Sequence, residues 1–120
     1  MKSYTDINQS KKLAEILPLE SADMCYPLPC EEGDKPLLEE GGFGSTPCWS
    51  LSALLNVLES EIYDEDGNTY ELNIEKDGTW WNIEYIERYG EKNPIEINST
   101  EELIDACYEM ILKLHELNLL

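Results

Sequence analysis

The chain has 120 residues and a formal net charge of −18, from 26 acidic side chains against 8 lysines and arginines. This length predicts one domain with a single core, and a hydrophobic share of 42% is typical of globular rather than disordered chains. The charge argues against direct binding to nucleic acid or anionic membranes, which are themselves negative. The alternative is that the charge only keeps a small protein soluble.

No apolar run in the sequence is as long as a membrane span, and residues 1–6 lack the apolar segment of a secretion signal. We therefore expect a cytoplasmic protein whose four cysteines are reduced. The sequence contains no internal repeat and no low-complexity tract.

The first element in chain order is a helix expected over residues 5–17, with Thr5 as its N-cap and Pro18 after its end. Residues 24–28 are apolar and contain a proline, which suits only an edge strand. Residues 27–46 are rich in proline, glycine and acidic side chains, which predicts a long loop.

A central helix is expected over residues 47–59. Thr46 suits the N-cap, and Pro47 suits the first helical position. Leucines then recur at spacings of three and four, so one face of this helix should be buried at the centre of the domain. These leucines are Leu51, Leu54, Leu55 and Leu58.

Residues 69–86 carry the clearest pattern, in which apolar and polar side chains alternate on both sides of Asp77-Gly78. This alternation predicts a β-hairpin, and Asp-Gly is a common two-residue hairpin turn. A register with Lys76 opposite Thr79 follows from that turn. It places three apolar pairs on one face: Ile74 with Trp81, Leu72 with Ile83, and Tyr70 with Tyr85.

A capping box at Ser99 and Glu102 predicts the start of a C-terminal helix over residues 100–117. Short strands are expected at 61–63 and 95–97. The elements together predict one α+β domain, in which the central and C-terminal helices pack a small antiparallel sheet built on the hairpin and an N-terminal helix completes the fold. The expected core is Leu13, Ile16, Trp49, Leu51, Leu54, Leu55, Leu58, Leu72, Ile74, Trp81, Ile83, Leu103, Cys107, Met110, Ile111 and Leu114.

Cys48 lies at the expected start of the central helix, where free backbone amides would lower the pKa of a thiol. The string at 44–53 resembles the nucleophile helix of papain-like cysteine proteases. Such a nucleophile needs an imidazole base, and the one histidine, His115, is expected in the last turn of a helix. We therefore interpret Cys48 as a buried hydrophobe beside Trp49, and a cysteine-dependent hydrolase using Cys48 is the least favoured hypothesis.

Metal sites are also disfavoured. A zinc site would have to use ligands that lack the usual close pairs: Cys25, Cys30, Cys48 and His115. The acidic stretch at 64–68 is similar to a calcium loop, but that alignment puts Ile62 and Asn73 where carboxylates belong, so a solvated turn is expected. We expect no catalytic residue, no cofactor and no metal.

Three stretches taken together carry a resemblance: Lys12-Leu13-Ala14-Glu15-Ile16-Leu17-Pro18-Leu19-Glu20-Ser21-Ala22-Asp23-Met24, Pro47-Cys48-Trp49-Ser50-Leu51-Ser52-Ala53-Leu54-Leu55, and Asp105-Ala106-Cys107-Tyr108-Glu109-Met110-Ile111 with Lys113-Leu114-His115-Glu116-Leu117. They resemble a family of small uncharacterised proteins from gut Bacteroides, often phage-like or associated with mobile elements. The resemblance covers roughly a third of the chain. It implies kinship and a mobile-element setting, and it implies no activity.

The leading functional hypothesis is a non-enzymatic binding or accessory protein that acts through protein–protein contacts of an acidic face. The alternative is a DNA mimic, whose carboxylates imitate phosphate spacing to occupy a DNA-binding protein such as a restriction enzyme. The partner's identity and the oligomeric state are left open.

The candidate contact site lies on the hairpin. Residues 59–91 hold eleven acidic side chains and two basic ones. In the expected register Glu71 faces Glu84 on the outer side, with Trp80 beside Glu75, and such a like-charge pair costs ~0.2–1 kcal/mol. A surface meant for a basic partner would gain from this arrangement, so we predict contact through Glu71, Glu75, Trp80 and Glu84. The alternative is an ordinary solvated sheet face.

Overall fold

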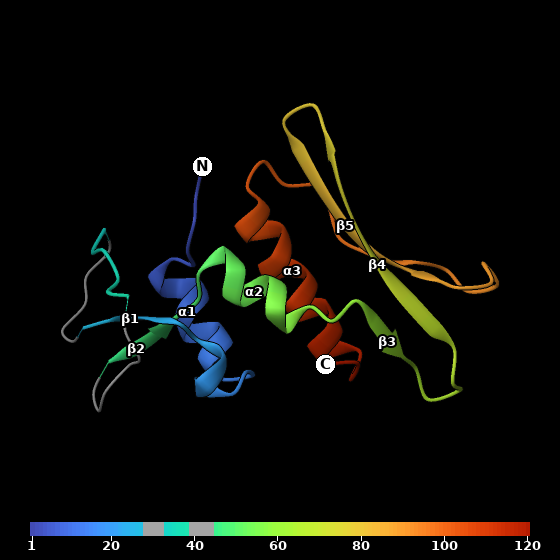
Figure 1. Cartoon of the computed structure of the whole chain (residues 1–120), viewed down its shortest axis with the longest axis horizontal. Helices are drawn as coiled ribbons and strands as arrows, with labels where there is room; N and C mark the ends of the chain where they lie inside the picture. The colour runs from blue at the N-terminus through green and yellow to red at the C-terminus, as the bar shows by residue number, and fades with distance from the viewer. Residues whose placement is uncertain (28–32, 39–44) are drawn as a thin grey trace. The chain divides into compact units, whose positions relative to one another are not determined.

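The computed structural model describes residues 1–27, 33–38 and 45–120 (Figure 1). Its helices and two small antiparallel sheets confirm the α+β class. Residue contacts divide the chain into two compact units, Met1–Val57 and Leu58–Leu120. The expected single domain, and the expected packing of the central helix on the hairpin's sheet, therefore stay predictions.

In the first unit, helix α1 (Ile7–Ala14) begins at a capping box. The side chain of Asp6 accepts the Gln9 N–H (2.7 Å), and the side chain of Gln9 accepts the Asp6 N–H (3.1 Å). Asp6, and not the predicted Thr5, is therefore the N-cap. Thr5 is instead fully buried, and its hydroxyl accepts a hydrogen bond from the backbone N–H of Trp49. A short 3₁₀ turn, η1 (Leu19–Ser21), follows the helix.

Strand β1 (Met24–Tyr26) pairs antiparallel with β2 (Thr46–Cys48). This pairing corrects one prediction, because 46–48 is a strand rather than a helix start. In the described two-stranded sheet β1 is an edge strand, as predicted. The N–H and C=O of Cys25 both bond to Leu37 on its other side (3.0 and 2.7 Å). Pro47 faces Cys25 across the pair, so its missing N–H costs no ladder hydrogen bond.

Helix α2 (Leu51–Val57) is consequently shorter than the predicted 47–59. Ser50 begins it, since the hydroxyl oxygen of Ser50 accepts the N–H of Ala53 (3.2 Å). The carboxylate of Asp23 in turn accepts the Ser50 N–H (2.9 Å) and the Ser50 hydroxyl proton. The predicted loop at 27–46 falls largely on residues 28–32 and 39–44, which lie outside the described residues.

In the second unit, one antiparallel sheet has the order β3 (Glu61–Tyr63), β4 (Thr69–Asp77), β5 (Trp80–Glu87), β6 (Ile95–Glu96). Helix α3 (Leu103–Glu116) lies against β5 and covers one face, called here the inner face (Figure 1). Buried apolar side chains come from this face and from α3: Ile62, Tyr70, Ile83, Tyr85, Ile95, Leu103, Ile104, Ala106, Cys107, Met110, Ile111 and Leu114.

The hairpin forms, but its register differs from the predicted one by two residues. Asp77 faces Trp80, so the two-residue loop is Gly78-Thr79 rather than Asp77-Gly78. Only Gly78 there has a positive φ (+63°), as in a type II′ turn, and Asp77 stays extended. A shift of two keeps every side chain on its predicted face but changes its partner. Ile74 faces Ile83, for example, and not Trp81.

Of the predicted core, ten residues are buried and six are half-buried. The half-buried ones are Ile16, Leu51, Leu55, Leu72, Ile74 and Trp81. Trp81 faces Lys76 across the hairpin, and the Lys76 ammonium lies 5.3 Å from the centre of its ring. A long cationic side chain therefore covers part of this half-buried tryptophan.

The C-terminal helix begins at Leu103, later than predicted, and the Ser99 capping box does not form. The backbone of Thr100 exchanges two hydrogen bonds with Trp81 (2.6 and 3.1 Å), which keeps this segment extended beside the sheet. The Ser99 hydroxyl bonds to the side chain of Asn82 instead. The helical conformation can start only after this pairing ends.

Candidate functional site

The four residues predicted to form the contact site share the outer face of the sheet, opposite to α3. Strand side chains alternate between faces, and the observed register keeps Glu71, Glu75, Trp80 and Glu84 on one side. Glu71 and Glu75 are exposed, Glu84 is half-buried, and Trp80 is 47% exposed. The structure therefore brings the predicted residues onto one surface, although their pairing was predicted wrongly.

Glu71 does not face Glu84. It lies between Glu61 on β3 and Ile86 on β5. Arg88 bridges the two carboxylates, with its Nη2 2.9 Å from Glu61 Oε1 and 3.2 Å from Glu71 Oε1. The hydrogen bond to Glu71 and the charge of Glu61 raise the pKa of the Arg88 guanidinium above its ordinary value. Glu71 is thus already compensated by a cation of its own chain.

Glu84 faces two other residues, Asn73 on β4 and Glu96 on β6. The side-chain amide of Asn73 donates to Glu84 Oε1 (3.2 Å). Within the described residues, no lysine or arginine pairs with Glu84 or Glu96. Among the described residues of the outer face, the like-charge pair that no lysine or arginine bridges therefore lies between β5 and β6 rather than within the hairpin.

An open hollow of about 230 Å³ lies at this pair. Its lining is mostly polar and acidic and comprises Glu75, Asn82, Ile83, Glu84, Glu96 and Ile97. We call this cavity the outer hollow. Three carboxylates and an amide oxygen make it suited to a cationic side chain, either an ammonium or a guanidinium.

Glu96 and Asn82 were missed by the sequence reasoning. A strand at 95–97 was predicted, but nothing in the local pattern showed which strand it pairs with. A prediction of β5 as the neighbour would have placed Glu96 beside Glu84.

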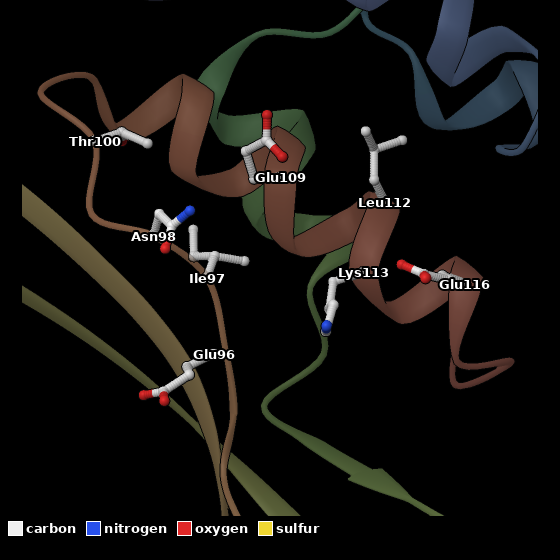
Figure 2. Close-up of a pocket in the computed structure, with 8 residues that line it drawn as sticks. All are labelled: Glu96, Ile97, Asn98, Thr100, Glu109, Leu112, Lys113 and Glu116. Carbon is white, nitrogen blue, oxygen red and sulfur yellow. The ribbon is translucent and has the colours of Figure 1, made fainter.

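A second, larger groove of about 670 Å³ lies beside α3 in the same unit. Figure 2 shows the segment from Glu96 to Thr100 running alongside the helix. The groove is lined by Glu96, Ile97, Asn98, Thr100, Glu109, Leu112, Lys113 and Glu116. We call this cavity the helix groove.

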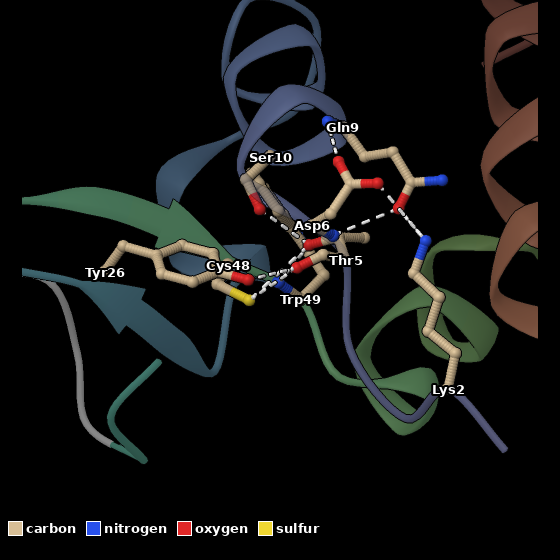
Figure 3. A network of polar contacts seen from close by, with 8 residues as sticks. All are labelled: Lys2, Thr5, Asp6, Gln9, Ser10, Tyr26, Cys48 and Trp49. Atoms are coloured by element: carbon tan, nitrogen blue, oxygen red, sulfur yellow. Dashed lines mark hydrogen bonds and ion pairs between the residues drawn. The ribbon is translucent and has the colours of Figure 1, made fainter. Parts of the chain in front are cut away.

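Cys48 was predicted at a helix N-terminus. It lies instead at the end of β2 and is fully buried. Its Sγ is 3.4 Å from the backbone oxygen of Thr5 and 3.5 Å from the Thr5 hydroxyl (Figure 3). Burial raises the pKa of the Cys48 thiol. A raised pKa disfavours the thiolate, which removes the basis on which this cysteine resembled a nucleophile.

The same buried cluster of the first unit is held by hydroxyl groups (Figure 3). The hydroxyls of Thr5 and Ser10 share a hydrogen bond (2.8 Å), and the Thr5 hydroxyl accepts the Trp49 N–H (3.1 Å). The hydroxyl of Tyr26 donates to the Thr5 backbone oxygen (2.7 Å). In the part of the chain that the structure describes, no buried side-chain nitrogen or oxygen lacks a partner, so the cluster has a structural explanation.

The geometry of the described residues supports neither the zinc site nor the calcium site that the sequence suggested. No group of three or more histidine, cysteine or acidic side chains in residues 1–27, 33–38 and 45–120 could hold a metal ion, and Cys30 lies outside these ranges. The turn at 64–68 is closed by its own hydrogen bonds, since Asp64 accepts the N–H groups of Asp66 (3.0 Å) and Asn68 (2.9 Å). The side-chain amide of Asn68 contributes most to lowering the pKa of Asp64.

Among the described helices, none combines the length and apolar character that crossing a membrane requires. The resemblance to the family from gut Bacteroides stays a prediction. No protein-family model, curated protein or solved structure matches this chain.

Proposed function

We propose that this protein is a non-enzymatic binding protein whose outer sheet face docks on a basic surface of a partner protein. The contact surface is Trp80 with the acidic lining of the outer hollow: Glu75, Glu84 and Glu96. The uncompensated pair of Glu84 and Glu96, placed opposite each other on neighbouring strands, is the observation that carries this proposal.

The pair has an energetic consequence. Like charges directly opposite each other in a sheet destabilise it by ~0.2–1 kcal/mol. A lysine or arginine of a partner, inserted into the outer hollow, would turn this repulsion into attraction on both carboxylates. The free protein therefore carries a small cost that complex formation removes.

Trp80 supplies the apolar part of the surface. It lies on the outer face, two residues along β5 from Asn82 in the outer hollow, and it is 47% exposed. An exposed tryptophan beside a charged pocket is typical of the residues that dominate binding energy at protein interfaces. Its ring can also take a neighbouring cation of the partner, at about 0.5–1 kcal/mol for an exposed contact.

The test compares two variants with the same change in net charge. The site variant replaces three glutamates of the outer hollow: Glu75→Gln, Glu84→Gln and Glu96→Gln. The control variant replaces three exposed glutamates elsewhere: Glu20→Gln, Glu65→Gln and Glu101→Gln. A partner is first captured from the native host with the tagged wild-type chain, and Kd is then measured for all three proteins with the purified partner.

We expect the site variant to raise Kd by about tenfold or more, and the control variant by about twofold or less. Equal effects of the two variants would mean that only overall charge matters, and the proposed surface would be wrong. Duplex DNA is added as a competitor in the same assay. If the partner is a DNA-binding protein and DNA displaces the chain, the DNA-mimic hypothesis replaces a general basic partner.

A further inference from the structure

The outer hollow and the helix groove meet at the same two residues. Glu96 and Ile97 line both cavities. One cavity opens on the outer face of the sheet, and the other lies beside α3, which covers the inner face (Figure 2). The two together form a continuous lining that passes around the β6 side of the sheet.

A β-bulge explains why the lining turns at this point. Between two backbone pairs, β5 advances three residues, from Glu84 to Trp81, whereas the opposite segment advances four, from Glu96 to Thr100. The extra residue bends the segment and increases its local twist. Residues 97–99 are therefore directed away from a regular ladder and toward α3, where Ile97 and Asn98 line the helix groove.

The charge of the helix groove matches that of the outer hollow. Its lining contains the carboxylates of Glu96, Glu109 and Glu116 and the single ammonium of Lys113, a net charge of −2. Leu112 and Ile97 add apolar surface between these charges. Long aliphatic stems with charged ends, as in lysine and arginine, are complementary to such a lining.

The position at the sheet's edge favours an extended occupant. β6 is an edge strand, since β5 is its only strand neighbour in the described part of the sheet. An edge strand can take an added extended peptide through its backbone groups, with side chains alternating into pockets on either side. A helix is about 10–12 Å wide and cannot follow a lining that turns around a single strand.

We propose that the partner contacts this chain through an extended cationic segment, which places one basic side chain in the outer hollow and continues over Glu96 into the helix groove. This inference rests on the proposed function, because it names the form of the partner for the same acidic face. It adds Glu109 and Glu116 of α3 to the contact residues.

The probe is a labelled peptide of about twelve residues with alternating lysine and alanine, which spans about 40 Å when extended. Its affinity is measured by fluorescence anisotropy against the full chain. The groove variant carries Glu109→Gln and Glu116→Gln. The outer-face variant carries Glu75→Gln and Glu84→Gln. The control variant carries Glu20→Gln and Glu101→Gln, which remove the same charge from exposed positions outside both cavities.

We expect the groove variant and the outer-face variant each to raise the Kd of the probe by about fivefold, and the control variant by less than about twofold. If the outer-face variant binds the probe more weakly and the groove variant binds it like the wild type, the proposed extended segment is wrong and the proposed function stands. A groove effect without an outer-face effect would overturn both. If all three variants bind alike, the probe senses net charge alone, and both are wrong.

Discussion

Replacing Thr5 by valine removes the hydroxyl at the centre of the buried cluster in the first unit and keeps the shape of the side chain. In the native protein this hydroxyl accepts the Trp49 N–H at 3.1 Å and shares a hydrogen bond with Ser10 at 2.8 Å. Thr5 and Ser10 are both fully buried. Water therefore cannot replace the lost partner without opening the unit.

The expected cost follows from the groups left behind. A buried donor or acceptor without its partner costs about 1–3 kcal/mol. The Trp49 N–H loses its acceptor outright, while the Ser10 hydroxyl can rotate toward a backbone oxygen of its own helix. We therefore expect Thr5→Val to lower the free energy of unfolding by about 1–3 kcal/mol, a large part of the ~5–15 kcal/mol typical of a native domain.

Urea unfolding followed by circular dichroism measures this loss, and amide hydrogen exchange at Trp49 reports it at the affected group. Thr79→Val is the matched control, because Thr79 is exposed in the hairpin turn, and it should change stability by less than about 0.5 kcal/mol. Thr5→Ser keeps the hydroxyl and should restore protection of the Trp49 amide. A Thr5→Val protein as stable as the control would refute the claim that this hydroxyl stabilises the unit.

Four further substitutions test the hairpin and the core. Glu84→Gln should raise the free energy of unfolding by ~0.2–1 kcal/mol, because it removes the like-charge pair with Glu96. Glu71→Gln should lower the free energy of unfolding slightly, because it breaks the ion pair with Arg88. Effects of the same sign in urea unfolding would contradict the observed register. Burial raises the pKa of Cys107 from 9.0 to about 12, so the stability from its neutral thiol is complete below pH 9 and lost as pH rises toward 12. Under reducing conditions, Cys107→Ala should flatten that decline by up to about 1.4 kcal/mol per pH unit, and unchanged slopes would argue against a buried neutral thiol. Gly78→Ala should cost about 1–2 kcal/mol in thermal or urea unfolding, because φ is +63° there, and a neutral result would exclude the observed turn.

The α+β class and the helix at the C-terminus were predictable because their signals are local. Alternating side chains on both sides of a glycine turn specify two strands and the face that each side chain takes. Apolar residues at helical spacing likewise specify the buried side of α3, where Leu103, Cys107, Met110 and Leu114 are all buried. Neither signal requires knowledge of a distant partner.

The pairing of side chains was not predictable in the same way. Registers that differ by two residues put the same side chains on the same face, so the hydrophobic pattern cannot distinguish them. The turn distinguishes them, because only Gly78 takes a positive φ and Asp77 stays extended. The true partner of Glu84 across the β5–β6 pair was hidden for a further reason, since β6 is only two residues long.

The sequence by itself therefore determined which segments of the second unit become strands and helix, and which face of each is apolar. Tertiary structure decided that Thr46–Cys48 is a strand, because Met24–Tyr26 lies beside it and Pro47 falls where no hydrogen bond is needed. It also decided that Glu84 and Glu96 form the acidic pair of the candidate site. The physical reason is common to both: periodicity and capping act within a few residues, whereas strand pairing joins residues far apart in the chain, and only the folded backbone shows which groups meet.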